Sequence, residues 1–224
     1  MGFWEHAAAA AAGAPLKGES SPTTFMLKNT GLCAAIWCFG VAALFIQISS
    51  TSFVASQLVD RSLSTVPIGV YLFMSAFGSA VGPFCIKRLG SRAFFMSAYT
   101  AALLGSIVNV LGLYFLEVSD PEGAFVCIVV GMVPQGFANG VTNNMRFAAT
   151  SFVAPPYAPR AISFVIWGAV FSAVLGPEIS KYTREWLDVE YVGNYVLVSI
   201  YLALCIVLCY IADWPPAVPR AAKP

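Results

Sequence analysis

The decapeptide PFCIKRLGSR, residues 83–92, decides how this chain folds. It carries the cations Lys87, Arg88 and Arg92 and lies between two apolar runs, each long enough to cross a bilayer. A connection this short makes the two flanking helices antiparallel neighbours. Because Lys and Arg in short loops mark the cytoplasmic side of a membrane, this turn also sets the direction of every other helix. On this stretch alone, the ordinary positive-inside loop of any multi-pass protein fits equally well.

The composition indicates an integral membrane protein. Apolar residues make up 58% of the chain and charged residues 10%, whereas about a quarter of the residues of a soluble domain are charged. The net charge of +1 gives no indication of a nucleic-acid partner. The six cysteines follow no metal or disulfide spacing and are interpreted as reduced packing residues. The single histidine, His6, excludes most histidine-based chemistry, so we expect neither an enzyme nor a bound metal or cofactor.

The apolar runs predict an all-α integral membrane protein with six transmembrane helices. The expected helices cover about residues 31–54, 66–84, 93–116, 124–144, 161–177 and 192–212. Residues 1–25 are expected to form a disordered cytoplasmic tail, 26–213 the bundle and 214–224 a second cytoplasmic tail. Gly176-Pro177 is expected to kink or end the fifth helix, because proline lacks the amide hydrogen that a helix interior uses.

The distribution of cations predicts that both termini are cytoplasmic. With the 83–92 turn inside, the cytoplasmic cations are Lys17, Lys28, Lys87, Arg88, Arg92, Arg146, Arg160, Arg220 and Lys223, and those outside are Arg61, Lys181 and Arg184. The last three spans begin roughly 95 to 100 residues after the first three, a spacing that predicts two inverted three-helix repeats.

Two faces are unusually polar for membrane helices. Each has three hydrogen-bonding side chains at helical spacing. They are Gln47, Ser50 and Thr51 in the first expected helix, and Gln135, Asn139 and Asn143 in the fourth. Lipid offers such side chains no partner, so both faces must meet protein or water. Two explanations stay open, namely hydrogen bonds between helices or a water-filled solute path.

With six expected spans and a basic turn after the second, the chain resembles the N-terminal six-helix half of a major facilitator superfamily transporter. The family pattern between the second and third helices is Gly-x-Leu-x-Asp-Arg-x-Gly-Arg-Arg. Arg88, Gly90 and Arg92 match it, whereas Lys87 stands at the position of the acid. Gln135-Gly136 matches the end of the family motif in the fourth helix, although that motif has an arginine where this chain has Met132. Gly176-Pro177 matches the Gly-Pro dipeptide of the family motif in the fifth helix.

The resemblance implies a conformational role for the motif residues Lys87, Arg88, Gly90, Arg92, Gly176 and Pro177. It also implies a solute cavity between two six-helix halves, since members of the family usually have twelve spans. We therefore expect either a fragment, or a chain that pairs with a second six-helix half or with a copy of itself.

The functional hypothesis is a secondary, facilitator-type transporter, or half of one, that moves a small polar or amphiphilic solute through a central cavity by alternating access. The alternative is a non-transporting membrane scaffold derived from the same fold. The amide-rich faces favour the transporter, and the loss of the motif acid at Lys87 favours the scaffold. The expected partners are the lipid bilayer, a small-molecule solute and either a second six-helix half or a second copy of the chain, with no nucleic acid. The solute, the energy coupling and the particular membrane stay open.

Overall fold

The computed structural model describes residues 22–117 and 119–214, and the described chain is helical with short connections. The long helices are α2 (Pro22–Leu58), α3 (Val66–Leu89), α4 (Ser91–Leu116), α5 (Pro121–Thr142), α7 (Ala158–Thr183) and α8 (Val192–Ile211). The short ones are η1 (Arg61–Leu63), α6 (Met145–Ala148), η2 (Ala149–Phe152) and η3 (Pro155–Tyr157). Each long helix lies in a segment that is long and apolar enough to cross a membrane. The chain is therefore a multi-pass integral membrane protein.

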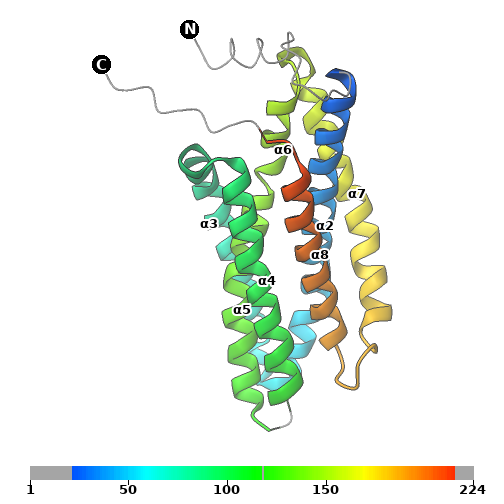
Figure 1. Ribbon diagram of the computed structural model, residues 1–224. Coiled ribbons are helices and arrows are strands. Elements are labelled where there is room, and N and C mark those ends of the chain that lie inside the picture. Colours follow the sequence, from blue (N-terminus) through cyan, green and yellow to red (C-terminus); the bar gives the residue numbers. More distant parts are fainter. Residues whose placement is uncertain (1–21, 118, 215–224) are drawn as a thin grey trace, which may run out of the picture.

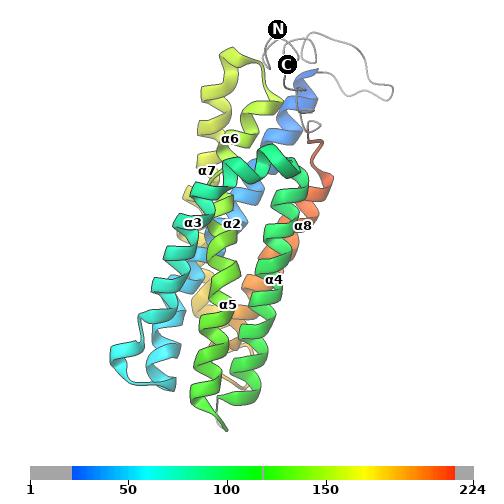
Figure 2. The same cartoon turned by 90° about the vertical axis from the view of Figure 1, so that its left-hand side faces the viewer.

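The bundle is organised around α2 and α5, which lie in the middle layer (Figures 1 and 2). Helix α5 packs against α3 and α4, while α2 packs against α7 and α8. Helices α4 and α8 pack against each other and cover one side. The first helix of each half, α2 or α5, thus packs mainly on the last two helices of the other half. This symmetric arrangement is compatible with two inverted three-helix repeats. The repeat itself stays a prediction.

Some helix ends differ from those expected from the sequence. Helix α2 begins at Pro22, so residues 22–25 are helical. Trp214, the first residue of the expected C-terminal tail, stacks on Phe95 and donates to the Cys209 carbonyl, and residues 1–21 and 215–224 fall outside the described residues. Helix α7 continues through Pro177 to Thr183. Proline removes one helical hydrogen bond, but Asn194 of α8 holds the turn beyond it. Its Nδ2 donates to Ser180 Oγ at 2.9 Å, and its Oδ1 accepts from the Thr183 hydroxyl.

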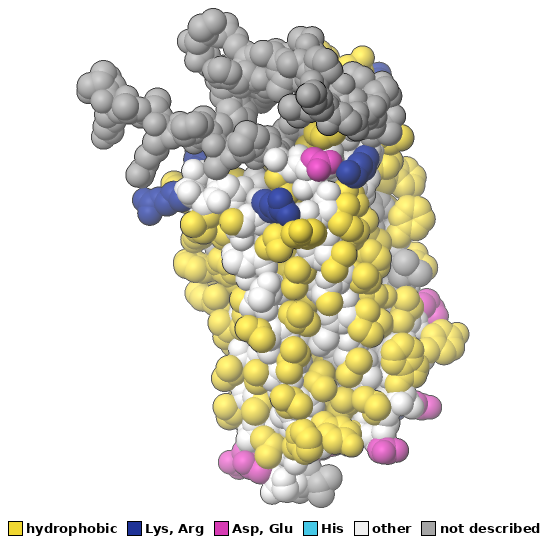
Figure 3. Space-filling view, in the orientation of Figure 1, with side chains coloured by type: hydrophobic (Ala, Val, Ile, Leu, Met, Phe, Trp, Pro, Cys, Tyr) yellow, Lys and Arg dark blue, Asp and Glu magenta, His cyan; other side chains and the backbone are white. Residues whose placement is uncertain are grey.

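Charges separate toward the two ends of the bundle, with most Lys and Arg near one end and most Asp and Glu toward the other (Figure 3). At the basic end Lys28 Nζ lies 2.9 Å from Asp213 Oδ2, and the Asp213 amide donates to Asn29 Oδ1 at 2.9 Å. The start of α2 and the end of α8 therefore meet at the basic end. At the acidic end, burial and then the neighbouring Glu190 carboxylate raise the pKa of Glu117 above its usual value. The positive-inside rule predicts that the basic end is cytoplasmic.

Glycine allows α3 and α5, and likewise α2 and α7, to approach until their backbones touch. A Cβ at Gly78 of α3 would meet a backbone carbonyl of α5, and a Cβ at Gly140 of α5 would meet the carbonyl of Ser75. In the second pair, a Cβ at Gly168 of α7 would meet the carbonyl of Ala34. Small residues permit such packing where lipid supplies no hydrophobic drive for helix association.

We expect Gly140→Ala to lower the free energy of unfolding by roughly 1–3 kcal/mol, because the added methyl group forces α3 away from α5. Thermal unfolding followed by circular dichroism in detergent measures the change. Gly69→Ala in α3 is the matched control, since a Cβ there meets nothing within 4 Å. Equal melting temperatures for the two variants would contradict the packing described here.

Candidate functional site

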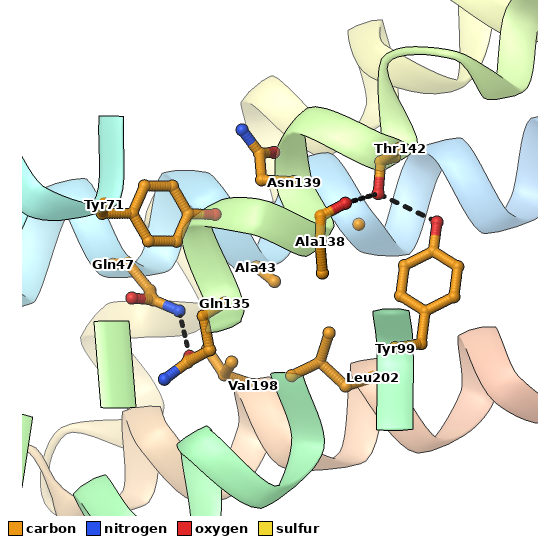
Figure 4. Close-up of a pocket in the computed structure, with 11 residues that line it drawn as sticks. Ala43, Gln47, Tyr71, Tyr99, Gln135, Ala138, Asn139, Thr142, Val198 and Leu202 are labelled. Carbon is orange, nitrogen blue, oxygen red and sulfur yellow. Dashed lines mark hydrogen bonds between the residues drawn. The ribbon is translucent and has the colours of Figure 1, made fainter. Parts of the chain in front are cut away.

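A small polar cavity lies in the middle of the bundle, between α2, α5 and the helices packed on them (Figure 4). Its polar lining consists of Gln47, Tyr71, Tyr99, Gln135, Asn139 and Thr142. The apolar part comes from small residues of α2 and α5 and from Val198 and Leu202 of α8. The free volume is about 10 Å³, close to the least that holds a single water molecule. Within the described helices, the cavity is nearly filled by its own side chains.

The central contact of the cavity is a hydrogen bond between two glutamine side chains. Gln47 Nε2 of α2 donates to Gln135 Oε1 of α5 at 2.5 Å, and Gln135 Nε2 donates to the carbonyl of Gly131 at 2.9 Å. The side chains are 1% and 3% exposed. Gln47 Oε1 is buried and has no partner among the described residues. An unpaired buried acceptor costs free energy, so this oxygen could accept a hydrogen bond from water or from a polar solute.

The other two amides of α5 reach α3. Asn139 Nδ2 donates to Ser75 Oγ at 2.8 Å, and Asn143 Nδ2 lies 3.4 Å from Ser79 Oγ. Asn139 borders the cavity, whereas Asn143 lies beyond it toward the basic end. The amide face of α5 therefore bonds two different helices. Gln135 bonds α2, whereas Asn139 and Asn143 bond α3.

The two hydroxyl residues of the α2 face lie outside the cavity. Ser50 Oγ donates to the Ile46 carbonyl of its own helix at 2.7 Å. Thr51 Oγ1 accepts from the Tyr195 hydroxyl at 3.1 Å and so joins α2 to α8. Of the six residues expected to line a solute path, the structure brings Gln47, Gln135 and Asn139 to one cavity.

Sequence reasoning missed the tyrosines that border this cavity. Tyr71 of α3 and Tyr99 of α4 are buried, and the Tyr99 hydroxyl lies 2.9 Å from Thr142 Oγ1 (Figure 4). Tyrosine in membrane helices is normally enriched at the interfaces. Its position well inside two apolar spans was the signal that could have identified them.

The residues expected to have a conformational role lie near opposite ends of the bundle. Gly90 has φ 82° and ψ 153°, a conformation that other residues rarely adopt, and it ends α3 and begins α4. Lys87 and Arg88 are exposed, whereas Arg92 Nη2 donates to the Tyr210 carbonyl at 3.2 Å, with its guanidinium 4.8 Å from that ring. Toward the acidic end, Gly176-Pro177 lies within α7, and a Cβ on the glycine would meet Phe45 of α2.

Six spanning helices around a buried polar centre define the chain as a multi-pass membrane protein. No known protein-family profile matches the sequence. The chain is similar to the riboflavin transporter RfnT of Brucella anthropi, with 22% identity over 190 residues. The similarity covers 84% of this chain and 46% of the relative, so the chain spans about half the length of the curated relative it matches. This likeness supports a role in membrane transport in general.

We expect Gln47→Leu and Gln135→Leu to be coupled in a double-mutant cycle. Each single variant leaves one buried amide without its partner, whereas the double variant removes both amides. Unfolding free energies in mixed micelles should give a coupling of about 0.5–1.7 kcal/mol, the range for hydrogen bonds between membrane helices. Strictly additive losses would contradict the glutamine contact.

Proposed function

We propose that the chain forms a six-helix unit of a secondary, facilitator-type transporter that moves a small polar or amphiphilic solute by alternating access. The observation that carries this proposal is the glutamine pair at the α2–α5 contact. Two long amide side chains are costly in a membrane interior, and helix association alone could use smaller residues. An amide pair with one unpartnered oxygen provides an exchangeable site, because a solute can replace one glutamine as the partner of the other.

The cavity as described is too small for an organic solute, so transport requires the elements around it to move. The Gln47–Gln135 hydrogen bond closes the α2–α5 contact, and the Tyr99–Thr142 contact closes the side toward the basic end. Both are side-chain contacts that break without loss of helical structure. We propose that this arrangement is a closed state and that the solute is bound when α2 and α5 separate.

A second six-helix unit, either another half or a copy of this chain, is proposed to complete the path. Two observations support this. The chain matches about half the length of its relative. In addition, α3 and α7 lie on the side of the bundle opposite α4 and α8 (Figure 2). Both helices carry large exposed apolar side chains, among them Phe73 and Trp167, which are 72% and 62% exposed. Those surfaces suit either lipid or a partner unit.

The solute class follows from the chemistry of the lining. The cavity offers amide and phenol groups beside apolar surface and, among its lining residues, no charged side chain. Such a site suits an uncharged amphiphile with hydrogen-bonding groups on an aromatic or aliphatic body. Riboflavin, the solute named for the relative, belongs to this class and is the first compound to test.

Uptake of radiolabelled riboflavin into proteoliposomes that contain the purified full chain tests the proposal. We expect saturable uptake that Gln135→Leu reduces by at least about tenfold, the factor that a lost hydrogen bond of roughly 1.4 kcal/mol produces. The matched control is Gln57→Leu, because Gln57 lies on the same helix as Gln47 but is exposed.

Melting temperatures are measured for each variant, so that lost uptake is separated from lost folding. Uptake that is equal to that of empty liposomes for riboflavin and for a panel of uncharged amphiphiles would contradict transport by this chain. Equal loss in Gln57→Leu and Gln135→Leu would contradict the assignment of the site.

One observation favours the alternative, a non-transporting scaffold. Asn139, Asn143 and Thr51 all bond neighbouring helices, as polar side chains do when they hold membrane helices together. In that case the polar residues would act on stability alone, and Gln135→Leu would lower the melting temperature with no solute flux in any variant.

A further inference from the structure

Three polar side chains near the basic end have buried atoms with no hydrogen-bond partner in the described part of the chain. They are Thr30 with Oγ1, Trp37 with Nε1 and Arg146 with Nε. Thr30 and Trp37 are each 6% exposed and, because they are two turns apart, share one face of α2, which packs against α6. Buried polar groups nearly always have a partner. Trp37 and Arg146 lie side by side, so their two unpartnered atoms indicate that a shared binding partner is missing.

The Arg146 guanidinium lies between two aromatic rings. Its Cζ is 5.7 Å from the ring centroid of Trp37 and 4.9 Å from that of Phe147. Aromatic faces attract the cation, but they accept no conventional hydrogen bond from its N–H groups. The ion pairs among the described residues use other cations, namely Lys28, Lys181 and Arg184.

The short helix that carries Arg146 begins inward of Lys87. The side chain of Asn144, at the start of α6, is next to Gly82, and a Cβ at that glycine would meet its amide. Gly82 precedes Lys87 by five residues in α3, which places the α5–α6 junction about 7 Å inward of Lys87 at 1.5 Å per residue. An arginine at the edge of the apolar zone normally pairs with an acid or contributes to a functional site.

The chemistry of the unpartnered atoms indicates the type of ligand. The Trp37 indole N–H and the Arg146 guanidinium N–H groups are donors only, so the missing group must be an acceptor. The positive charge favours an anion, and the planar guanidinium matches the paired oxygens of phosphate or carboxylate. Asp213, at the same end, already bonds Lys28.

We propose that Arg146 and Trp37 form a binding site for a phosphate group at the basic end, between α2 and α6, with the Thr30 hydroxyl on the same face. The phosphate comes either from the headgroup of an anionic lipid or from a soluble phosphate. This site lies apart from the glutamine cavity and does not depend on transport. Arg146 supplies the charge and Trp37 supplies a ring face and a donor.

Calorimetric titration of the purified full chain in detergent tests the proposal. One arm uses a short-chain phosphatidic acid, with phosphatidylcholine of the same chain length as reference, and the other uses inorganic phosphate. We expect saturable binding in at least one arm. Binding of the lipid alone identifies a headgroup site, and binding of inorganic phosphate identifies a site for soluble anions.

Two variants separate the roles of the two side chains. Arg146→Gln should weaken binding by roughly tenfold or more, because it removes a charge-assisted hydrogen bond. Trp37→Phe keeps an aromatic ring but removes the indole N–H, and it should weaken binding severalfold. Arg160→Gln is the matched control, since this exposed arginine at the same end lies 5.8 Å from the Tyr157 ring, and it should leave affinity unchanged.

Three results would overturn the proposal. The first is no saturable binding of either anion, and the second is an equal loss of affinity in Arg160→Gln and Arg146→Gln. The third concerns Glu5 and Glu19, which lie outside the described residues. If anions bind to the double variant Glu5→Gln/Glu19→Gln but not to the unmodified chain, the partner of Arg146 is a carboxylate of this chain. The unmodified chain then binds no external phosphate at this site.

Discussion

The absence of water from the bilayer core is the constraint on which this structure depends, and the hydrogen bond between Gln47 and Gln135 is where it acts most strongly. In the bilayer core an amide side chain has to find its partner within the protein. The two glutamines meet most of that requirement by facing each other across the α2–α5 contact, which leaves Gln47 Oε1 without a partner among the described residues. Their pairing orients α2 and α5 toward each other, and the other two amides of α5, Asn139 and Asn143, then reach α3.

Close backbone contact provides the rest of the cohesion. Gly78 and Gly140 bring α3 against α5, and Gly168 brings α7 against α2. The exchange of partners between the two halves of the chain makes α2 and α5 the central pair, with α4 and α8 on one side. The polar centre and the glycine contacts act together, because the helix that carries Gln135 also carries Gly140.

Much of the helical framework could be predicted from the sequence, because span length and apolar content are local properties. The 83–92 turn predicted that α3 and α4 are antiparallel neighbours, but these helices pack on each other only slightly, because α3 packs mainly on α5 and α4 mainly on α5 and α8. Helical spacing predicted which side chains share a face, yet it could not predict which neighbour that face meets. For this reason Ser50, Thr51 and Asn143 fall outside the cavity, while Tyr71 of α3 and Tyr99 of α4 enter it. Pro177 did not end α7, because the distant Asn194 holds the turn beyond it.

The central claim is that the α2–α5 contact opens to bind a solute. The most direct test is the variant Ala138→Cys in a chain whose six native cysteines are replaced, because Ala138 is buried in the cavity lining and the substitution leaves both glutamines in place. The reaction of this cysteine with a water-soluble maleimide is followed in membranes. If the contact opens, the cysteine is labelled slowly and riboflavin or another transported amphiphile protects it. A cysteine that stays unreactive with and without solutes, in a variant that retains its fold, would show that the contact stays closed and would contradict the account.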